Sequence, residues 1–181
     1  MPCGRLMSAS AKSNETPEER MFARVMFAMI DFAARKGLAP DAKQTQAVVS
    51  RGSIKQRARV TGIRGETYAY WYLRRHGYLM VARNYSVPGL KGEIDMAGYD
   101  GSVLAFVEVK TRSVTNDGPR KMALPEEAVN SEKQRNVTRM ARQFLRARRV
   151  ETEPYRFDVV AIETRPGSRP EVRLHKGAYT G

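Results

Sequence analysis

Apolar positions along the chain predict three helices. Residues 17–36 form the first, because Thr16-Pro17-Glu18-Glu19 is a capping box with proline at the first helical position. Residues 55–76 and 130–149 show the same helical period. The apolar residues that recur at helical spacing in the first helix are Met21, Phe22, Val25, Met26, Met29, Ile30 and Ala33. Such a helix needs a surface to cover it. We expect that surface on its own domain or on a second copy of the chain, with a membrane surface as the alternative.

Runs of β-forming residues predict strands over residues 78–87, 92–99, 102–111 and 156–163, with an edge strand over 171–175. Taken with the helices, the order is helix, three strands, helix, strand. This order predicts an α/β fold with a central mixed sheet flanked by helices, preceded by a helical extension. We divide the chain into an extension, residues 1–57, which ends in a linker over residues 40–52, and a domain, residues 58–181.

Acidic residues gather on the hairpin formed by the second and third strands. Asp100-Gly101 is a two-residue turn signal. With that turn, Tyr99 pairs with Ser102, Asp95 faces Phe106, and Glu93 faces Glu108. Side chains alternate across a strand, so two faces can be separated. The apolar face, expected to be the core side, holds Ile94, Met96, Ala105, Val107 and Val109. The other face holds Glu93, Asp95, Glu108 and Lys110, beside Leu104 and Phe106.

Like charges that face each other across a strand pair are destabilising, so a compensating group is expected. A divalent cation, Mg²⁺ or Mn²⁺, suits carboxylate oxygens. The alternative is a solvated strand face on which Lys110 forms an ordinary salt bridge. Glu93 is open to several roles: a ligand, a residue that orients a ligand, or a partner of a nearby cation. Asp158, on the fourth predicted strand, is expected to pair with Arg156 or a neighbour, or else to point toward the same acidic patch.

The charge balance favours a polyanionic partner. The 181 residues include 32 Lys and Arg against 19 Asp and Glu, a net charge of +13. Nucleic acid or, less often, an anionic membrane face attracts such a chain. A single cysteine excludes an internal disulfide and a cysteine-based zinc site. There is no apolar stretch long enough to span a membrane, and a cytoplasmic protein is the expectation.

Basic residues are densest in the third predicted helix, which has one acidic residue, Glu132. Those off its apolar stripe form a cationic face that suits phosphates, and a solvated helix surface is the alternative. With Arg112 on a neighbouring loop, the candidate nucleic-acid contacts are Arg112, Lys133, Arg135, Arg139, Arg142 and Arg146. No zinc-finger spacing or aromatic strand pair is present, so sequence-independent or shape-dependent binding is expected.

Several short motifs occur together in a characteristic order. They are Gly65-Glu66, Arg83-Asn84-Tyr85, Gly92-Glu93-Ile94-Asp95, Phe106-Val107-Glu108-Val109-Lys110-Thr111-Arg112, the segment 125–129 with Lys133-Gln134, and Arg156-Phe157-Asp158-Val159-Val160. From residue 62 to residue 177 the chain resembles the YraN-like family of small bacterial proteins. That resemblance implies a restriction-endonuclease-like fold, similar to that of archaeal Holliday-junction resolvases.

The resemblance also implies roles for four residues. Asp95 matches the first acid of the nuclease pattern, Glu108 the second, and Lys110 the lysine that follows it. Glu66 matches the acid that the preceding helix often adds to the metal site. Ile94 departs from the pattern, where proline is frequent. In these terms the catalytic candidates are Asp95, Glu108 and Lys110, and the metal candidates are Glu66, Asp95 and Glu108.

The expected function is nucleic-acid binding with Mg²⁺-dependent endonuclease activity, selective for structure rather than sequence. DNA is the favoured substrate, with branched DNA as one form, and no membrane partner is expected. Two alternatives remain open. One is a binding module with the same fold and no turnover, and the other is a protein that binds a protein partner through residues 17–36. A homodimer is also left open.

Overall fold

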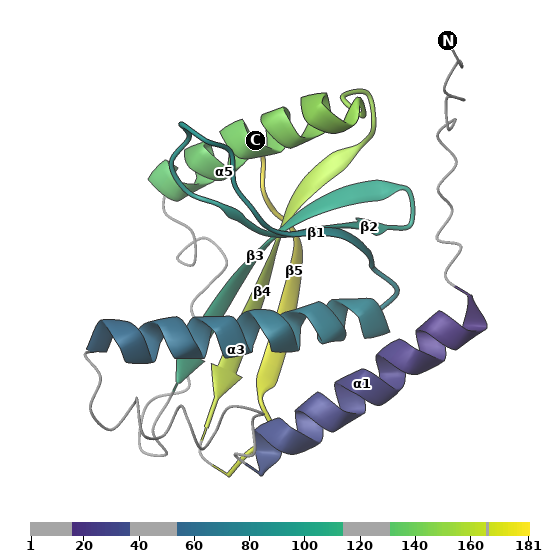
Figure 1. Cartoon of the computed structure of the whole chain (residues 1–181), viewed down its shortest axis with the longest axis vertical. Coiled ribbons are helices and arrows are strands. Elements are labelled where there is room, and N and C mark those ends of the chain that lie inside the picture. The colour runs from purple at the N-terminus through teal and green to yellow at the C-terminus, as the bar shows by residue number, and fades with distance from the viewer. Residues whose placement is uncertain (1–15, 37–53, 114–130, 166) are drawn as a thin grey trace.

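The structure is a computed structural model that describes residues 16–36, 54–113, 131–165 and 167–181. The predicted linker 40–52 and the family motif at residues 125–129 lie outside these ranges. The elements are α1 (Pro17–Arg35), α3 (Ile54–Arg75), β1 (Leu79–Tyr85), β2 (Ile94–Asp100), β3 (Val103–Ser113), α5 (Ser131–Arg148), β4 (Tyr155–Thr164) and β5 (Glu171–Tyr179). Their order is the predicted one (Figure 1). Helix α3 runs across residue 57, where the extension was expected to end.

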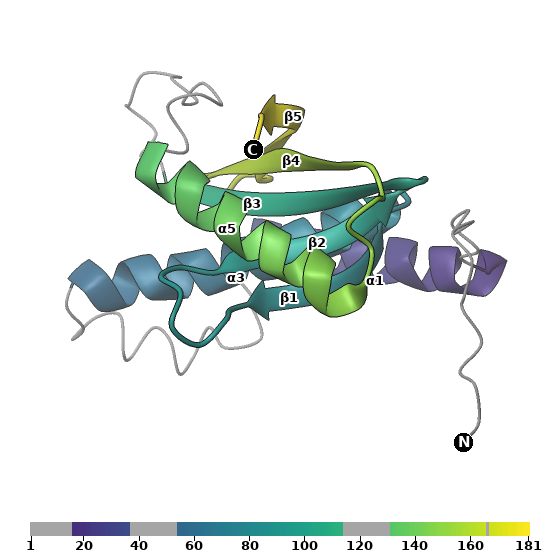
Figure 2. The same ribbon diagram turned by 90° about the horizontal axis from the view of Figure 1, so that it is seen from above.

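The five strands form one mixed sheet in the order β1-β2-β3-β4-β5. Strands β1, β2 and β3 are antiparallel neighbours, β3 and β4 run parallel, and β5 is antiparallel to β4. Helix α5 makes the crossover that a parallel pair requires. Seen along the sheet, α5 covers one face, while α3 and α1 lie on the other (Figure 2). The predicted α/β class, with a mixed sheet flanked by helices, is confirmed.

Both faces of the sheet are therefore packed, where the sequence indicated a single core side. Met96, Ala105 and Val107 pack under α3 as predicted. The face that carries Glu108 is covered by α5, and its Leu104 and Phe106 are buried against residues of that helix. Ile94 was expected on the same face as Met96, and this was wrong, because it packs with the α5 cluster while Met96 packs with the α3 cluster. Because helices cover both faces of the sheet, an apolar side chain at the start of β2 can be buried on either face.

The hairpin register differs from the predicted one by two residues. Tyr99 pairs with Leu104 and Asp100 pairs with Val103, so the loop residues are Gly101 and Ser102. Gly101 occupies the first loop position with φ +64°. A loop at residues 100 and 101 would have required a left-handed Asp100, which costs more than placing the glycine there. A shift of two residues does not by itself move a side chain to the other face, since the side-chain period is two, and Asp95 and Glu108 keep their predicted face.

Helix α1 docks on α3 through a stripe that its apolar pattern did not indicate. Its buried residues are Ala23, Phe27 and Asp31. The Phe27 ring lies 5.3 Å from that of Tyr68 on α3, edge to face. Asp31 accepts hydrogen bonds from the Tyr68 hydroxyl at 2.7 Å and from Arg169 Nε, in the turn before β5, at 3.0 Å. The buried carboxylate thus ties α1 to two separate parts of the domain.

Four of the apolar residues predicted to dock α1 are instead exposed, because the aromatic contact and the ion pairs of Asp31 select the adjacent stripe. They are Met21, Phe22, Val25 and Met29, and Phe32 is exposed beside them. None of the helices in the described ranges is long and apolar enough to cross a membrane.

Asp158 forms a structural ion pair with Arg156, which is one of the two roles predicted for it. It is completely buried, and Arg156 Nε donates to its Oδ1 at 2.8 Å. Arg156 also reaches Asp100 at 2.5 Å, and the Tyr78 hydroxyl donates to Asp158 Oδ2 at 3.1 Å. The group joins the hairpin end of β2 to β4, and Lys176, 2.6 Å from Asp100, supplies the second positive charge that balances the two acids.

Candidate metal and nucleic-acid site

Two buried carboxylates lie where β2 and β3 cease to pair. The last pair of the ladder is Met96 with Val107, and Asp95 and Glu108 are the next residues beyond it. The main-chain N–H of Val109 donates to Asp95 Oδ2 at 2.7 Å. Asp95 and Glu108 are only 7% and 3% exposed. The two-residue correction of the register brings Asp95 toward Glu108, where Phe106 had been expected, so the predicted acid pair is closer than the sequence alone indicated.

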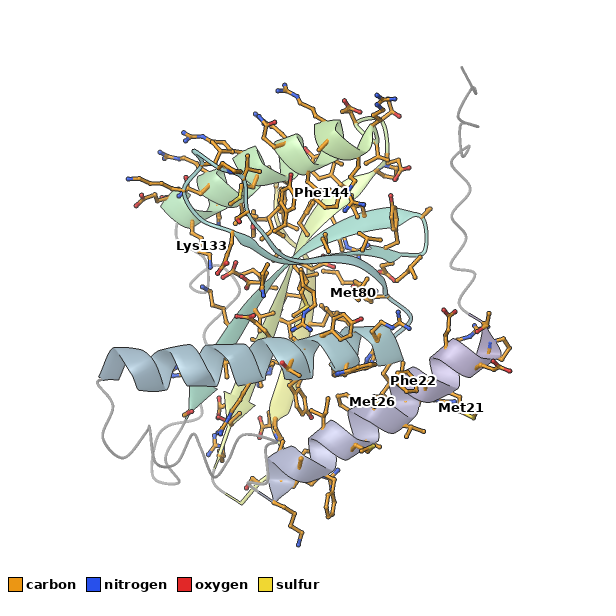
Figure 3. The ribbon with its side chains drawn as sticks, viewed as in Figure 1. Met21, Phe22, Met26, Met80, Lys133 and Phe144 are labelled. Atoms are coloured by element: carbon orange, nitrogen blue, oxygen red, sulfur yellow. The ribbon has the colours of Figure 1, made fainter. Side chains whose placement is uncertain are left out.

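Two lysines hold one oxygen of Glu108 and leave the other without a partner. Lys110 Nζ lies 2.9 Å from Glu108 Oε1, and Lys133 Nζ, from the first turn of α5, makes a short contact with the same oxygen. Lys133 extends from α5 toward the sheet (Figure 3). Glu108 Oε2 is buried and has no hydrogen-bond partner. A buried carboxylate oxygen without a partner is costly, so this atom marks a place suited to a further positive or donor group.

The electrostatics of the pair favour retention of a proton. Burial, and then the charge of Glu108, raise the pKa of Asp95 from 3.8 to about 7, although the Val109 hydrogen bond opposes this. Burial lowers the pKa of Lys133, but the hydrogen bond and charge of Glu108 more than offset this, and the net pKa is raised. Lys133 is therefore a firm cation beside two acids that repel each other.

Glu66 reaches this region because α3 passes very close to β3. A Cβ atom at Gly65 would collide with the side chain of Thr111, so only glycine fits there. Glu66, the next residue, is half-buried. Burial, then the charges of Glu93 and Glu108, raise its pKa. Glu93 is exposed just before β2. It was predicted to face Glu108, but the observed register places Asp95 beside Glu108 instead.

The donor set fits one hard divalent cation. Within the described ranges, no three His, Cys, Asp or Glu residues are arranged as a ready-made metal cage. Asp95 and Glu108 instead offer two carboxylates, one with an unpartnered oxygen. Mg²⁺ is commonly held by one or two carboxylates, with waters and substrate phosphates completing its octahedron. The chemistry of the site matches that mode, and Glu66 stays a predicted additional ligand.

Two adjoining hollows form a groove along α5, which Lys133 links to Glu108, and the linings together carry four basic residues and two acids. A hollow of about 270 Å³ is lined by Gly92, Glu93, Glu132, Lys133, Asn136 and Val137. A second hollow of about 410 Å³ shares Glu132 and Asn136 with it and adds Gly89, Leu90, Lys91, Arg135 and Arg139. Sequence reasoning did not assign Lys91 and Asn136 to the site, because only the fold brings the β1–β2 connection beside α5.

The predicted nucleic-acid residues do not all lie at the groove. Arg135 and Arg139 line it, and Arg142 and Arg146 are exposed further along the same helix. Arg112 is exposed near the end of β3 and lines neither hollow. Lys133 stands apart from the arginines, because its ammonium is engaged by Glu108. The sequence of this helix shows a run of basic residues. Only the packing of α5 on the sheet shows that Lys133 is the one that contacts Glu108.

Comparison with known proteins places the same region in a family. The model of the uncharacterised protein family UPF0102 matches residues 65–162. A UPF0102 protein of Koribacter versatilis is 43% identical over 120 residues, which are 66% of this chain and 78% of that protein. A UPF0102 protein of Symbiobacterium thermophilum is 42% identical over 122 residues, 67% of this chain and 98% of that protein. The matched region contains α3 from Gly65, both carboxylates, and the whole of α5.

Proposed function

We propose that this chain, which belongs to the uncharacterised protein family UPF0102, is a metal-dependent nuclease that hydrolyses phosphodiester bonds in DNA. The family membership agrees with the resemblance to YraN-like proteins that the sequence motifs indicated. Since UPF0102 is defined without an activity, the proposal rests on the site.

The observation that carries the proposal is the buried pair Asp95 and Glu108. Burying two acids side by side is unfavourable for folding, as the raised pKa of Asp95 reflects. The unpartnered Glu108 Oε2 adds to that cost. A surface salt bridge for Lys110, the alternative interpretation, would need neither feature. Ionisable groups that are buried close together, although this lowers the stability of the fold, are typical of binding and catalytic sites.

Each residue has a distinct task in the proposed reaction. Asp95 and Glu108 would hold Mg²⁺ or Mn²⁺, with Glu66 acting through water. When bound, such an ion polarises the scissile phosphate and lowers the pKa of a coordinated water. Lys110, positioned by Glu108, would stabilise the negative charge that develops on the phosphate oxygens. Val109 would keep the Asp95 carboxylate oriented through its N–H.

Lys133 would hold Glu108 in place and present a second cation to the substrate. Its contact to Glu108 comes from a helix, whereas that of Lys110 comes from the adjacent position on the same strand face. The two ammonium groups therefore approach one carboxylate from different elements. Removing Lys133 would free α5 from the site and leave Glu108 with one cation.

The groove along α5 supports nucleic acid as the substrate class. Lys91, Arg135 and Arg139 line a hollow that adjoins the one containing Lys133. A strand whose scissile phosphate met Lys110 could place its neighbouring phosphates against these cations. Contacts of this kind read the backbone and not the bases, so we propose recognition of DNA structure, including branched forms.

Cleavage assays test the proposal directly. Wild-type protein should cut branched, single-stranded or duplex DNA with Mg²⁺ or Mn²⁺, and should not cut in EDTA. Asp95→Ala and Lys110→Ala should each abolish cleavage while the far-ultraviolet circular dichroism stays unchanged. Glu151→Ala removes an exposed acid elsewhere and serves as the matched control. Cleavage by both site variants at the wild-type rate would refute the assignment.

A second candidate is a nucleic-acid-binding module without turnover, which the exposed arginines of α5 favour on their own. Fluorescence anisotropy in EDTA separates the two, because it measures DNA binding without cleavage. Binding without cutting under every metal condition would support the module and contradict the nuclease.

A further inference from the structure

Helix α1 carries a second apolar stripe that the described ranges leave largely uncovered, the one ring contact printed for it being between Phe22 and the edge of Trp71 on α3, at 5.9 Å. Five large apolar side chains on this stripe are between 52% and 63% exposed. They are Met21, Phe22, Val25, Met29 and Phe32. Single exposed apolar residues are common, but five on one helix face form a contiguous patch, which is typical of an interaction surface.

The exposed stripe lies on the side of α1 opposite to the one that docks. Successive residues of a helix are rotated by about 100°, which separates the set around Val25 from the buried set Ala23, Phe27 and Asp31 by nearly half a turn. Figure 3 shows Met26 on the side of α1 that faces α3 and Met21 on the side away from it, with Phe22 at the edge of the stripe nearest α3. A partner can therefore reach Val25 and Met29 without meeting α3, whereas at Phe22 it also meets the edge of Trp71.

The spacing of the stripe is that of a helix-pairing seam. Phe22, Val25, Met29 and Phe32 are separated by three, four and three residues. This is the spacing of the a and d positions of a coiled coil. The positions are also symmetric about residue 27, since Phe22 and Phe32 lie equally far from it, as do Val25 and Met29. Two antiparallel copies would place Phe22 against Phe32 and Val25 against Met29.

The charges on the stripe have the same symmetry. Glu18 begins it and Lys36 ends it, and both are exposed. They too are equidistant from residue 27 and lie on the same side of the helix as Val25. An antiparallel pair places Glu18 opposite Lys36 of the second copy at both ends of the seam. A parallel pair would place like charges together at both ends, and it would also align the two helix dipoles unfavourably.

We propose that α1 pairs antiparallel with α1 of a second copy of this chain, around a two-fold axis near residue 27. A two-fold interface requires a surface that complements itself, and here both the apolar and the charged positions do so. Neither a flat lipid surface nor an unrelated protein calls for that symmetry. The pairing is independent of the proposed nuclease activity, since α1 lies before residue 65, where the family match begins.

Sedimentation of the full chain over a range of concentrations tests the pairing. Wild-type protein should show a reversible monomer–dimer equilibrium. Val25→Asp combined with Met29→Asp should remain monomeric at every concentration, with unchanged circular dichroism. Gln143→Asp, at an exposed position of α5, should dimerise like wild type. A wild-type chain that stays monomeric, or a double variant that still dimerises, would overturn the proposal.

A charge-swap cycle tests the orientation. Glu18→Lys alone and Lys36→Glu alone should each raise the dimer dissociation constant by at least about five-fold, since each single change removes two ion pairs. The double swap should restore the wild-type constant, because it re-forms both pairs. Parallel pairing predicts that the single swaps leave the constant nearly unchanged, because each replaces one like-charged pair by another, and that result would overturn the antiparallel seam. Binding of the monomer to anionic phospholipid vesicles, lost in the Val25→Asp, Met29→Asp variant, would identify a membrane surface and overturn the proposal as well.

Discussion

Replacing Asp95 by asparagine should stabilise this protein at alkaline pH. The Asp95 carboxyl is buried next to Glu108, and its pKa is raised to about 7 from 3.8. An acid with a raised pKa destabilises the folded state where it must ionise. Asparagine has no charge, and its amide oxygen can still accept the hydrogen bond that Val109 N–H donates. The variant therefore removes the cost of ionisation and keeps the local geometry.

The size of the effect follows from proton linkage. Below about pH 4, Asp95 is protonated in both the folded and the unfolded chain, so its pKa shift contributes nothing to the free energy of unfolding. Between pH 4 and pH 7 only the unfolded chain loses the proton, and the wild-type protein loses stability as the pH rises. Above pH 7 the full penalty is present, up to about 4 kcal/mol for a shift of about three pH units. In a domain of this size that corresponds to about 10 °C in Tm.

Thermal unfolding of both proteins from pH 4 to pH 9, in EDTA, measures the difference. The Asp95→Asn curve should separate from the wild-type curve as the pH rises and run parallel to it above about pH 7.5. Asp158→Asn is the matched control, since that buried acid is paired with Arg156, and the same change should destabilise the protein. A Tm of Asp95→Asn at or below that of wild type at pH 8.5 would refute the electrostatic reasoning.

Three further predictions address the groove, the helix contact and the α1 anchor. Arg135→Ala with Arg139→Ala should lower the slope of log K against log salt for duplex DNA by about 1.8, measured by anisotropy, and an unchanged slope would remove these residues from the interface. Gly65→Ala should lower the Tm by several degrees because its Cβ meets β3, whereas Gly62→Ala, which has open space, should leave the Tm unchanged or raise it. Tyr68→Phe should cost about 1–2 kcal/mol in denaturant unfolding, through the lost hydrogen bond to the α1 carboxylate, and no change would contradict that anchor.

Local patterns predicted the elements of this fold well, because helix caps, periodicity and turn residues act over a few positions. The capping box at Thr16 is present, with the Glu19 N–H donating to the Thr16 hydroxyl. The hairpin register was wrong because two turns compete at Asp100-Gly101-Ser102. The choice between them depends on which residue adopts a positive φ. Asp95 and Glu108 stayed on one face despite the error, since a shift of two residues changes neither face, but the predicted facing pair of Glu93 and Glu108 was replaced by Asp95 and Glu108.

Features that join distant segments could not be predicted from periodicity. The Lys133 contact to Glu108 spans 25 positions and exists because α5 packs on the face that carries the acids. In α1, the more strongly apolar stripe is the exposed one, because Asp31 and Phe27 find partners on α3. Counting apolar residues therefore predicts the wrong docking side of a helix when a buried ion pair determines how the helix is oriented.

The anchoring of α1 by Asp31 has a consequence for synthesis on the ribosome. Arg169 follows Asp31 by 138 positions, so the helix made first completes its ion pairs with a turn made much later. Before that turn is made α1 can already pack on α3 through Tyr68, which follows Asp31 by 37 positions, but the carboxylate of Asp31 still lacks Arg169. The final seating of α1 therefore waits for the far end of the domain, and a chain cut short before β5 would hold this helix less firmly.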